Sequence, residues 1–345
     1  MVLSVQPAAI NNDTGISFQS LRQDGRCDRL IDLYLVLDSS GSIPQPVFQQ
    51  AKEAMKEIIQ RLDVGPKKVM VTVVNYGSTV EVPVELASIP ITEITVSRIL
   101  TQIDNIKYIG SGTATGDALW KVYERCVTLK KCRDLHFGAS RTILVFTDGQ
   151  SNTGRPILAA KTDLFVKGKA EIFAVGIGNG IQDAELLTIA TNEKYVRHFK
   201  DYVQLLQEIN FITLEACGIP AFVVPNVRVS SEVEANDYRF YQLDTKELIT
   251  RAGNSNTLGG YVEITANIKK GDIAVFTSSS DPNPKAGTSR RASWETRAGG
   301  HYYLEYIEHD SSRLYFSFLG ADLQNEYDFE VRWLDMNGNI VAQIG

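Results

Sequence analysis

The chain has 345 residues, a length that fits one or two domains of about 150 residues each. Its residues are 43% hydrophobic and 22% charged, which is ordinary for a globular protein with a large core. The 41 Asp and Glu outnumber the 35 Lys and Arg, so no nucleic-acid surface is expected. No apolar run reaches the roughly 18 residues that a membrane-spanning helix needs.

The first ten residues, MVLSVQPAAI, lack the basic stretch and the apolar stretch of a secretory signal. The sequence is therefore expected to represent either a mature or recombinant form or an intracellular protein. We treat residues 1–26 as an N-terminal segment ahead of the first domain.

Four cysteines favour the extracellular alternative. Cys27 and Cys217 lie just outside the two ends of the first domain, and Cys126 and Cys132 lie close together in one helix-to-loop segment. These positions suggest the disulfides Cys27–Cys217 and Cys126–Cys132, formed in an oxidising compartment. Four cysteines allow three connectivities, and four buried thiols are the alternative.

Strand-like and helix-like segments alternate from Ile31 to about Leu214. The expected strands are 31–38, 68–76, 79–86, 141–148, 171–178 and 195–199. The expected helices run from near Pro46 to Leu62 and near 95–105, 113–130, 154–168, 181–191 and 201–215. Several strands are apolar almost throughout, as strands covered by helices on both faces must be. We therefore predict an α/β domain over residues 27–217, with a doubly wound, mostly parallel sheet.

The sequence changes character after Cys217. Residues 218–226, GIPAFVVPN, contain two prolines and are interpreted as a linker. Residues 227–345 are predicted to form an all-β sandwich or jelly roll, because short strand-like runs alternate with turns and no useful helical period occurs. The expected strands are 238–244, 261–268, 272–279, 301–308, 313–320, 327–335 and 339–345, with a tight hairpin at Asn337-Gly338 and a long polar loop over 278–300.

The segment Asp38-Ser39-Ser40-Gly41-Ser42 ends the first apolar strand. One interpretation is a capping turn, since Ser and Asp favour helix starts. The other is a metal site, because oxygen ligands at alternate positions suit a hard cation such as Mg²⁺, Mn²⁺ or Ca²⁺. The pentapeptide alone leaves both interpretations open.

Two further segments favour the metal site. Thr113 lies in a glycine-rich loop, GSGTATG, that opens a helix, and Asp148 ends another buried strand. Asp38 and Asp148 are expected at the ends of neighbouring strands. Two carboxylates at such a short distance repel each other, and this costs free energy unless a cation lies between them. The sequence therefore predicts a divalent cation site, with Mg²⁺ as the first choice.

Three segments resemble the metal-ion-dependent adhesion site of the von Willebrand factor A family. They are DxSxS at Asp38–Ser42, the loop with Thr113, and the strand-end TDG with Asp148. The resemblance covers roughly residues 30–215 and implies a Rossmann-like fold. It implies that Ser40, Ser42 and Thr113 contact the cation directly, and that Asp38 and Asp148 act largely through water. It also implies that a partner supplies a carboxylate. The second domain is faintly similar to jelly-roll domains appended to secreted proteins.

Two hypotheses of function follow. The first is a secreted or cell-surface adhesion protein, whose cation binds an acidic group of an extracellular protein or matrix ligand. The alternative is a structural matrix component, whose metal site mainly stabilises the domain while assembly uses other surfaces. The second domain is also considered for a carbohydrate contact. An enzyme is not expected, because the sequence shows no nucleophile or base in a catalytic pattern.

Overall fold

The computed structural model describes residues 27, 29–178, 180, 182–251, 259–297, 300–308 and 310–341. The predicted N-terminal segment 1–26 lies outside the described residues, and so does the end of the expected last strand. No helix in the described part of the chain is long and apolar enough to cross a membrane.

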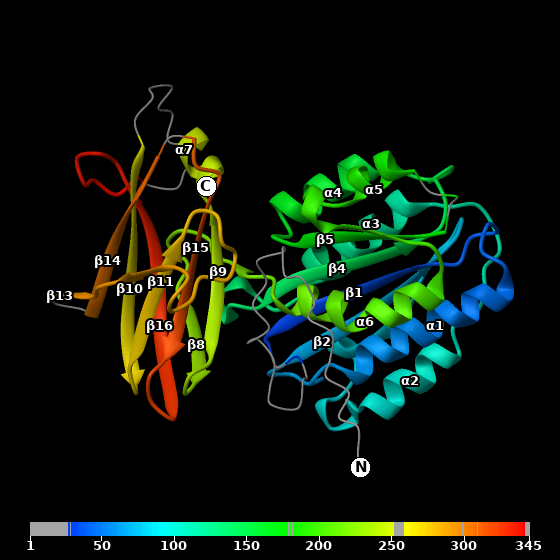
Figure 1. Ribbon diagram of the computed structural model, residues 1–345, viewed down its shortest axis with the longest axis horizontal. Helices are drawn as coiled ribbons and strands as arrows, with labels where there is room; N and C mark the ends of the chain where they lie inside the picture. The colour runs from blue at the N-terminus through cyan, green and yellow to red at the C-terminus, as the bar shows by residue number, and fades with distance from the viewer. Residues whose placement is uncertain are drawn as a thin grey trace, which may run out of the picture.

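The first half of the chain forms an α/β domain around a six-stranded sheet (Figure 1). The strand order is β3-β2-β1-β4-β5-β6, and all neighbouring pairs are parallel except the antiparallel pair of β2 and β3. The strands are β1 (Ile31–Asp38), β2 (Val69–Tyr76), β3 (Val80–Glu85), β4 (Ser140–Thr147), β5 (Glu171–Ile177) and β6 (Val196–Phe199). Strands β1 and β5 are buried along their whole length, as their apolar sequences predict. Strand β3, which contains Pro83, lies at the sheet edge, where a residue without a backbone N–H is tolerated.

Helices cover both faces of this sheet. Helices α3, α4 and α5 lie on one face and α1 and α6 on the other, with α2 beside α1 (Figure 1). The helices are α1 (Gln45–Gln60), α2 (Val96–Asp104), α3 (Thr115–Tyr123), α4 (Ile157–Val166), α5 (Asp183–Ile189) and α6 (Tyr202–Cys217). A single π-helical turn, Glu124–Thr128, continues α3. The predicted doubly wound α/β fold is therefore confirmed.

Both predicted disulfides are present. Cys27 is joined to Cys217 across 190 residues, and Cys126 to Cys132 across six. The first disulfide links the beginning of the α/β domain to the last residue of α6. A cross-link that closes so long a loop restricts the unfolded chain strongly.

The second half contains two five-stranded sheets, β13-β14-β10-β16-β8 and β12-β11-β15-β9-β7, that share one apolar core. The strands are β7 (Ala221–Phe222), β8 (Val229–Glu234), β9 (Tyr238–Asp244), β10 (Gly260–Lys270), β11 (Ile273–Ser278), β12 (Arg290–Ala292), β13 (Glu295–Arg297), β14 (Gly300–Ile307), β15 (Arg313–Gly320) and β16 (Gln324–Leu334). One short helix that was not predicted, α7 (Thr245–Arg251), follows β9. The long polar loop over 278–300 contains the short strands β12 and β13.

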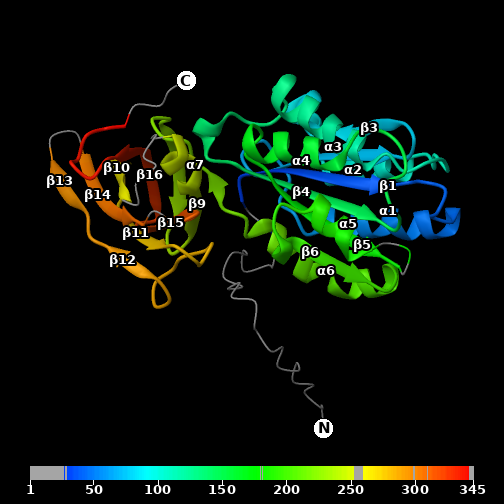
Figure 2. The same cartoon turned by 90° about the horizontal axis from the view of Figure 1, so that it is seen from above.

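The two halves meet at the end of the α/β sheet where its parallel strands begin (Figures 1 and 2). Strand β7 follows α6 directly and pairs in parallel with β9 of the second half. The amide of Asn283 donates a hydrogen bond of 2.8 Å to the carbonyl of Gly218. The chain segment between the halves is thus packed into the structure.

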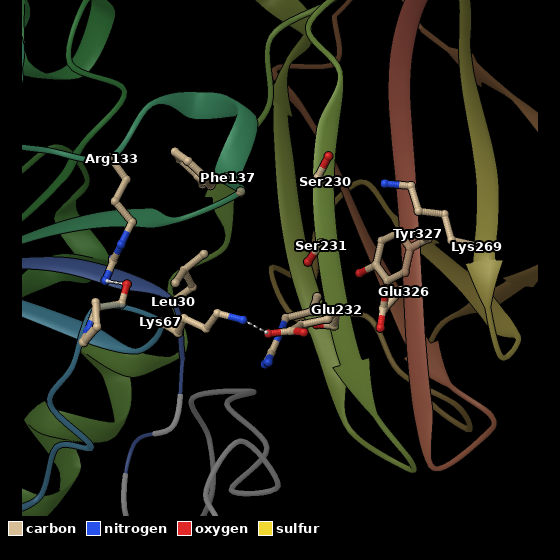
Figure 3. A pocket seen from close by; sticks show the side chains of 13 residues that line it. Leu30, Lys67, Arg133, Phe137, Ser230, Ser231, Glu232, Lys269, Glu326 and Tyr327 are labelled. Carbon is tan, nitrogen blue, oxygen red and sulfur yellow. Dashed lines mark hydrogen bonds and ion pairs between the residues drawn. The ribbon is translucent and has the colours of Figure 1, made fainter.

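A pocket of about 480 Å³ opens beside this junction (Figure 3). The side chain of Phe137 lines it from the α/β domain, and Ser231 and Tyr327 line it from the sandwich. The ammonium group of Lys67 and the carboxylate of Glu232 face each other across it at 3.8 Å. Both side chains are largely exposed, so this ion pair adds little to the attachment of the halves.

Candidate metal centre

The carboxylate of Asp38 is held in one orientation. Asp38 ends β1 and is fully buried, and its Oδ1 accepts a hydrogen bond of 2.8 Å from the backbone N–H of Ser40. Its Oδ2 accepts hydrogen bonds from the hydroxyl of Thr147 at 2.7 Å and from that of Tyr76 at 3.3 Å. These three donors fix both oxygens before any ligand binds.

The glycine-rich loop lies directly beside the turn after β1. Ser40 and Ser111 form a parallel backbone bridge, and the N–H of Gly41 donates to the carbonyl of Ser111 at 2.7 Å. The N–H of Gly110 donates to the carbonyl of Ser39 at 2.9 Å. Gly110 has φ +66°, a left-handed conformation that glycine adopts without strain. The sequence GSG therefore lets the two loops run side by side.

Side-chain oxygens meet where these loops approach the end of β4. The hydroxyl oxygens of Ser40 and Ser42 are 3.0 Å apart, and the Ser42 hydroxyl donates to Oδ1 of Asp148 at 2.7 Å. Gly149 permits this approach, since a Cβ at that position would lie 3.2 Å from the Ser42 oxygen. The three residues form a continuous row of oxygen atoms beyond the strand ends.

Thr113 is held in the neighbouring loop through its backbone. Its N–H donates to Oδ1 of Asn152 at 2.9 Å, and its carbonyl accepts from the Asn152 N–H at 3.0 Å and the Ser151 hydroxyl at 3.2 Å. The residue is 3% exposed. The structure thus brings Ser40, Ser42 and Asp148 together and places Asp38 against Ser40. Thr113 is fixed in the loop whose Ser111 pairs with Ser40.

The electrostatics of the cluster favour a bound cation. Burial raises the pKa of Asp38 to about 6, against the hydrogen bonds from Ser40 and Thr147, and the nearby charge of Asp148 raises it further. Burial also raises the pKa of Asp148. Two carboxylates that are both disfavoured as anions would be stabilised by a positive ion between them.

The available donors fit a hard divalent cation. The donor atoms of the cluster are carboxylate and hydroxyl oxygens, and oxygen atoms are the ligands that Mg²⁺ and Ca²⁺ prefer. Within the described ranges, no group of three or more His, Cys, Asp or Glu side chains is placed to hold a metal. A cation at this cluster would be held by serine and threonine oxygens as well as by carboxylates.

Three residues that orient the cluster were not singled out in the sequence. Tyr76 lies opposite Asp38 in the register of β1 and β2, Thr147 immediately precedes Asp148, and Asn152 follows it in the next loop. The order of the strands could have indicated Tyr76, because it ends the strand next to Asp38. Nothing local indicates that the Thr147 hydroxyl points across to Asp38, because that contact joins residues 109 apart in the chain.

A doubly wound α/β domain with hydroxyl and carboxylate oxygens gathered beyond its central strand ends defines the class of protein. Residues 32–210 match the von Willebrand factor type A domain, and the chain belongs to this family.

The chain is similar to parts of longer proteins. It is 30% identical to the mouse (Mus musculus) collagen alpha-4(VI) chain over 236 residues, which cover 66% of this chain and 9% of that one. It is 30% identical to human (Homo sapiens) matrilin-1 over 213 residues, covering 59% of this chain and 41% of that one. The chain thus spans less than half the length of either relative.

Solved structures also resemble it at low identity. One is proximal thread matrix protein 1 from the mussel byssus, with a zinc-occupied MIDAS motif, at 22% identity and a TM-score of 0.49 over 61% of this chain and 50% of that one. Another is a von Willebrand factor type A protein from Catenulispora acidiphila, at 15% identity and a TM-score of 0.46 over 92% of this chain and 60% of that one.

Proposed function

We propose that the α/β domain binds a divalent cation, Mg²⁺ first and Mn²⁺ or Ca²⁺ as alternatives, and uses it to hold a carboxylate of an extracellular protein or matrix ligand. Ser40, Ser42 and Thr113 would contact the ion directly, and Asp38 and Asp148 would act largely through water. The ion supplies an open coordination position and the positive charge that a carboxylate needs.

The observation that carries this proposal is the row of oxygens from Ser40 through Ser42 to Asp148, with spacings of 3.0 and 2.7 Å. It lies beyond the carboxyl ends of the central strands, where open α/β sheets bind their ligands. Ser42 is exposed and Asp148 is partly exposed, so the row is open to a partner on one side.

An extracellular setting is supported independently of the site. Both disulfides require an oxidising compartment to persist, as in secreted proteins. Relatives named as collagens and matrilins agree with a matrix or adhesion role. We propose binding rather than catalysis, with the sandwich as a spacer, stabiliser or second contact.

The first test is calorimetric titration of Mg²⁺ into protein freed of metal with EDTA. The wild type is expected to bind one ion, and Asp148→Ala and Ser42→Ala to lose at least about tenfold in affinity. Ser280→Ala, an exposed hydroxyl on the sandwich, is the control and should bind as the wild type does. Thermal melts establish that each variant is folded. Equal Mg²⁺ affinity of Asp148→Ala and the wild type would overturn the cation site.

The second test captures partners from the native tissue with Mg²⁺ and then washes with EDTA. Release of the partner by EDTA, and no capture by Asp148→Ala, are expected. A partner that stays bound through EDTA contradicts cation-mediated adhesion and favours the structural matrix alternative.

A further inference from the structure

A groove of about 680 Å³ opens next to the candidate metal centre. The loop of residues 150–156 and the start of α5 form its walls. The same loop holds Thr113, because Ser151 and Asn152 bond to the Thr113 backbone. A partner segment whose carboxylate reached the cation would therefore lie along this groove.

The groove offers one negative charge and an apolar side chain. The carboxylate of Glu185 is half-buried in it, and its Oε1 accepts a hydrogen bond of 2.6 Å from the Ser151 N–H. Leu158 lines the groove with 60% of its surface exposed. The cation of Arg155 is already engaged, since it lies 3.4 Å from Asp117 and stacks over Trp120. A partner that fits this groove carries an acidic side chain for the cation, a basic one for Glu185 and an apolar one for Leu158, all on one rigid segment.

The sandwich of this same chain presents such a segment. Two turns lie together at one end of it (lower end of the sandwich in Figure 1). One is formed by Lys270, the last residue of β10, with Gly271-Asp272 before β11, and the other is Asp322-Leu323 between β15 and β16. We call these five residues the acidic tip. All five are exposed, and Leu323, at 87%, is the most exposed large hydrophobic residue in the described part of the chain.

One buried side chain makes the acidic tip rigid. Asn325 is 1% exposed, and its Oδ1 accepts the N–H groups of both Asp272 and Asp322 at 3.0 Å. Its amide donates to the carbonyls of Val233 and Asp322. Gly271 has φ +72°, and a Cβ there would lie 2.4 Å from the Asn325 oxygen, so the close turn requires glycine. A rigid tip loses little conformational entropy when it binds.

The charges of the acidic tip are available to a partner. Oδ1 of Asp272 accepts the N–H of Ile273 at 2.8 Å, which leaves Oδ2 without a bond to any described residue. The ammonium group of Lys270 donates to the neutral side chain of Gln324 and forms no ion pair within the described ranges. The acidic tip therefore combines a free carboxylate oxygen, an uncompensated cation and a protruding leucine.

We propose that the acidic tip of one molecule docks at the candidate metal centre of a second copy. Asp272 supplies the carboxylate to the cation, Lys270 faces Glu185, and Leu323 packs on Leu158. This inference rests on the proposed function. The contact joins different molecules, because β1 points away from the sandwich and carries the metal centre to the far end of the molecule (Figures 1 and 2). A contact between two different surfaces leaves one of each free on every dimer, so it builds chains of molecules, or rings where the rotation between copies closes.

Sedimentation velocity tests this contact with the protein alone. The proposed contact involves few residues, and small interfaces bind weakly. The protein is therefore examined at concentrations up to roughly 1 mM. The wild type is expected to form dimers and longer species with Mg²⁺ and to be monomeric in EDTA. Asp272→Asn, which keeps the size of the side chain, is expected to weaken association at least tenfold and to bind Mg²⁺ as the wild type does. Asp310→Asn, an exposed carboxylate outside the acidic tip, is the matched control and should associate normally.

A mixing experiment identifies the two surfaces. Asp148→Ala lacks a working metal centre and Asp272→Asn lacks a working tip, so each should be monomeric alone. Their equimolar mixture should form a dimer and stop there, since it contains only one productive pair of surfaces. Leu158→Ser should weaken self-association without changing Mg²⁺ affinity, because Leu158 lines the groove with 60% of its surface exposed.

The outcomes separate this inference from the proposed function. A wild type that binds Mg²⁺ but stays monomeric contradicts the contact between copies and does not contradict the metal centre. Association that survives EDTA or the Asp272→Asn change also overturns it. Failure of the wild type to bind Mg²⁺ overturns both.

Discussion

The guanidinium of Arg313 donates a hydrogen bond of 2.6 Å to the carboxylate of Glu171 across the boundary between the α/β domain and the sandwich. Glu171 is fully buried at the start of β5, and Arg313 is mostly buried at the start of β15. The guanidinium also lies 5.2 Å from the ring centroids of both Phe165 and Phe222. The pair therefore ties the two halves together in a largely buried site.

Removing the charge of Glu171 should destabilise the whole protein. Glu171→Gln leaves the buried Arg313 cation uncompensated, and breaking a buried ion pair from one side costs about 3–5 kcal/mol. Urea denaturation measures the loss. We also expect the two halves of the variant to unfold in separate transitions, because the halves lose a buried ionic connection.

The exposed pair at the same junction provides the control. Glu232→Gln removes the partner of Lys67, and both side chains are more than half exposed. Exposed pairs contribute about 0–1 kcal/mol, so this variant should unfold almost as the wild type does. Equal stabilities of the two variants would show that the Glu171–Arg313 pair does not hold the halves together.

The fold of the first half could be predicted because each buried parallel strand is a nearly continuous apolar run. The segments Ile31–Asp38 and Glu171–Ile177 are buried at every position, and no other arrangement satisfies such strands as well. The fold of the second half was harder to predict from the sequence. Strands β12 and β13 have three residues each, too few to show a period, and α7 has only seven.

The sequence singles out the residues proposed for the metal centre but not how they are arranged. Asp38 ends β1, Ser40 and Ser42 follow it, Asp148 follows β4, and Thr113 lies in the loop before α3. The hydrogen bonds that orient them depend on strand order and side-chain direction. The Glu171–Arg313 pair joins residues 142 apart and has no local signature at all.

Lys285 should make stability depend on pH. It is 4% exposed, and its ammonium group lies over the rings of Tyr238 and Phe240. Burial lowers its pKa from 10.5 to about 8, the charge of Arg29 lowers it further, and the carboxylates of Asp281 and Asp237 oppose both effects.

The direction in which stability changes with pH follows from the number of protons that the folded and the unfolded state bind. Below pH 8 the lysine is charged in the folded and the unfolded protein, and folding bears the full cost of burying that charge. Between pH 8 and 10.5 the unfolded state binds more protons, so the contribution of Lys285 to the unfolding free energy rises with pH. Lys285→Met removes this dependence.

Urea denaturation of the wild type and Lys285→Met at roughly pH 7 and pH 9.5 measures the effect. The stability of Lys285→Met relative to the wild type should be greater at the lower pH and should fall as pH rises. Lys200→Met changes an exposed lysine and should show no such trend. A difference between the wild type and Lys285→Met that is the same at both pH values would contradict the buried charge.

The Thr147 hydroxyl should matter for cation binding although it is not among the proposed ligands. It donates to Oδ2 of Asp38 at 2.7 Å, and Thr147→Val keeps the volume and branching of the side chain while removing that donor. Residues that orient metal ligands typically contribute about 10–100-fold to metal affinity. Calorimetry with Mg²⁺ should show a loss in this range, and Thr147→Ser, which retains a hydroxyl, should recover much of it.

The same strand contains the matched control. Thr142 is also a fully buried threonine of β4, but its hydroxyl is directed to the carbonyl of Ala216, at 3.5 Å, near the other end of the strand. Thr142→Val should therefore bind Mg²⁺ as the wild type does, even if both valine variants melt at a lower temperature. If Thr147→Val retained wild-type Mg²⁺ affinity while folded, Asp38 would not need this hydrogen bond, and its orientation would have to come from Ser40 and Tyr76 alone.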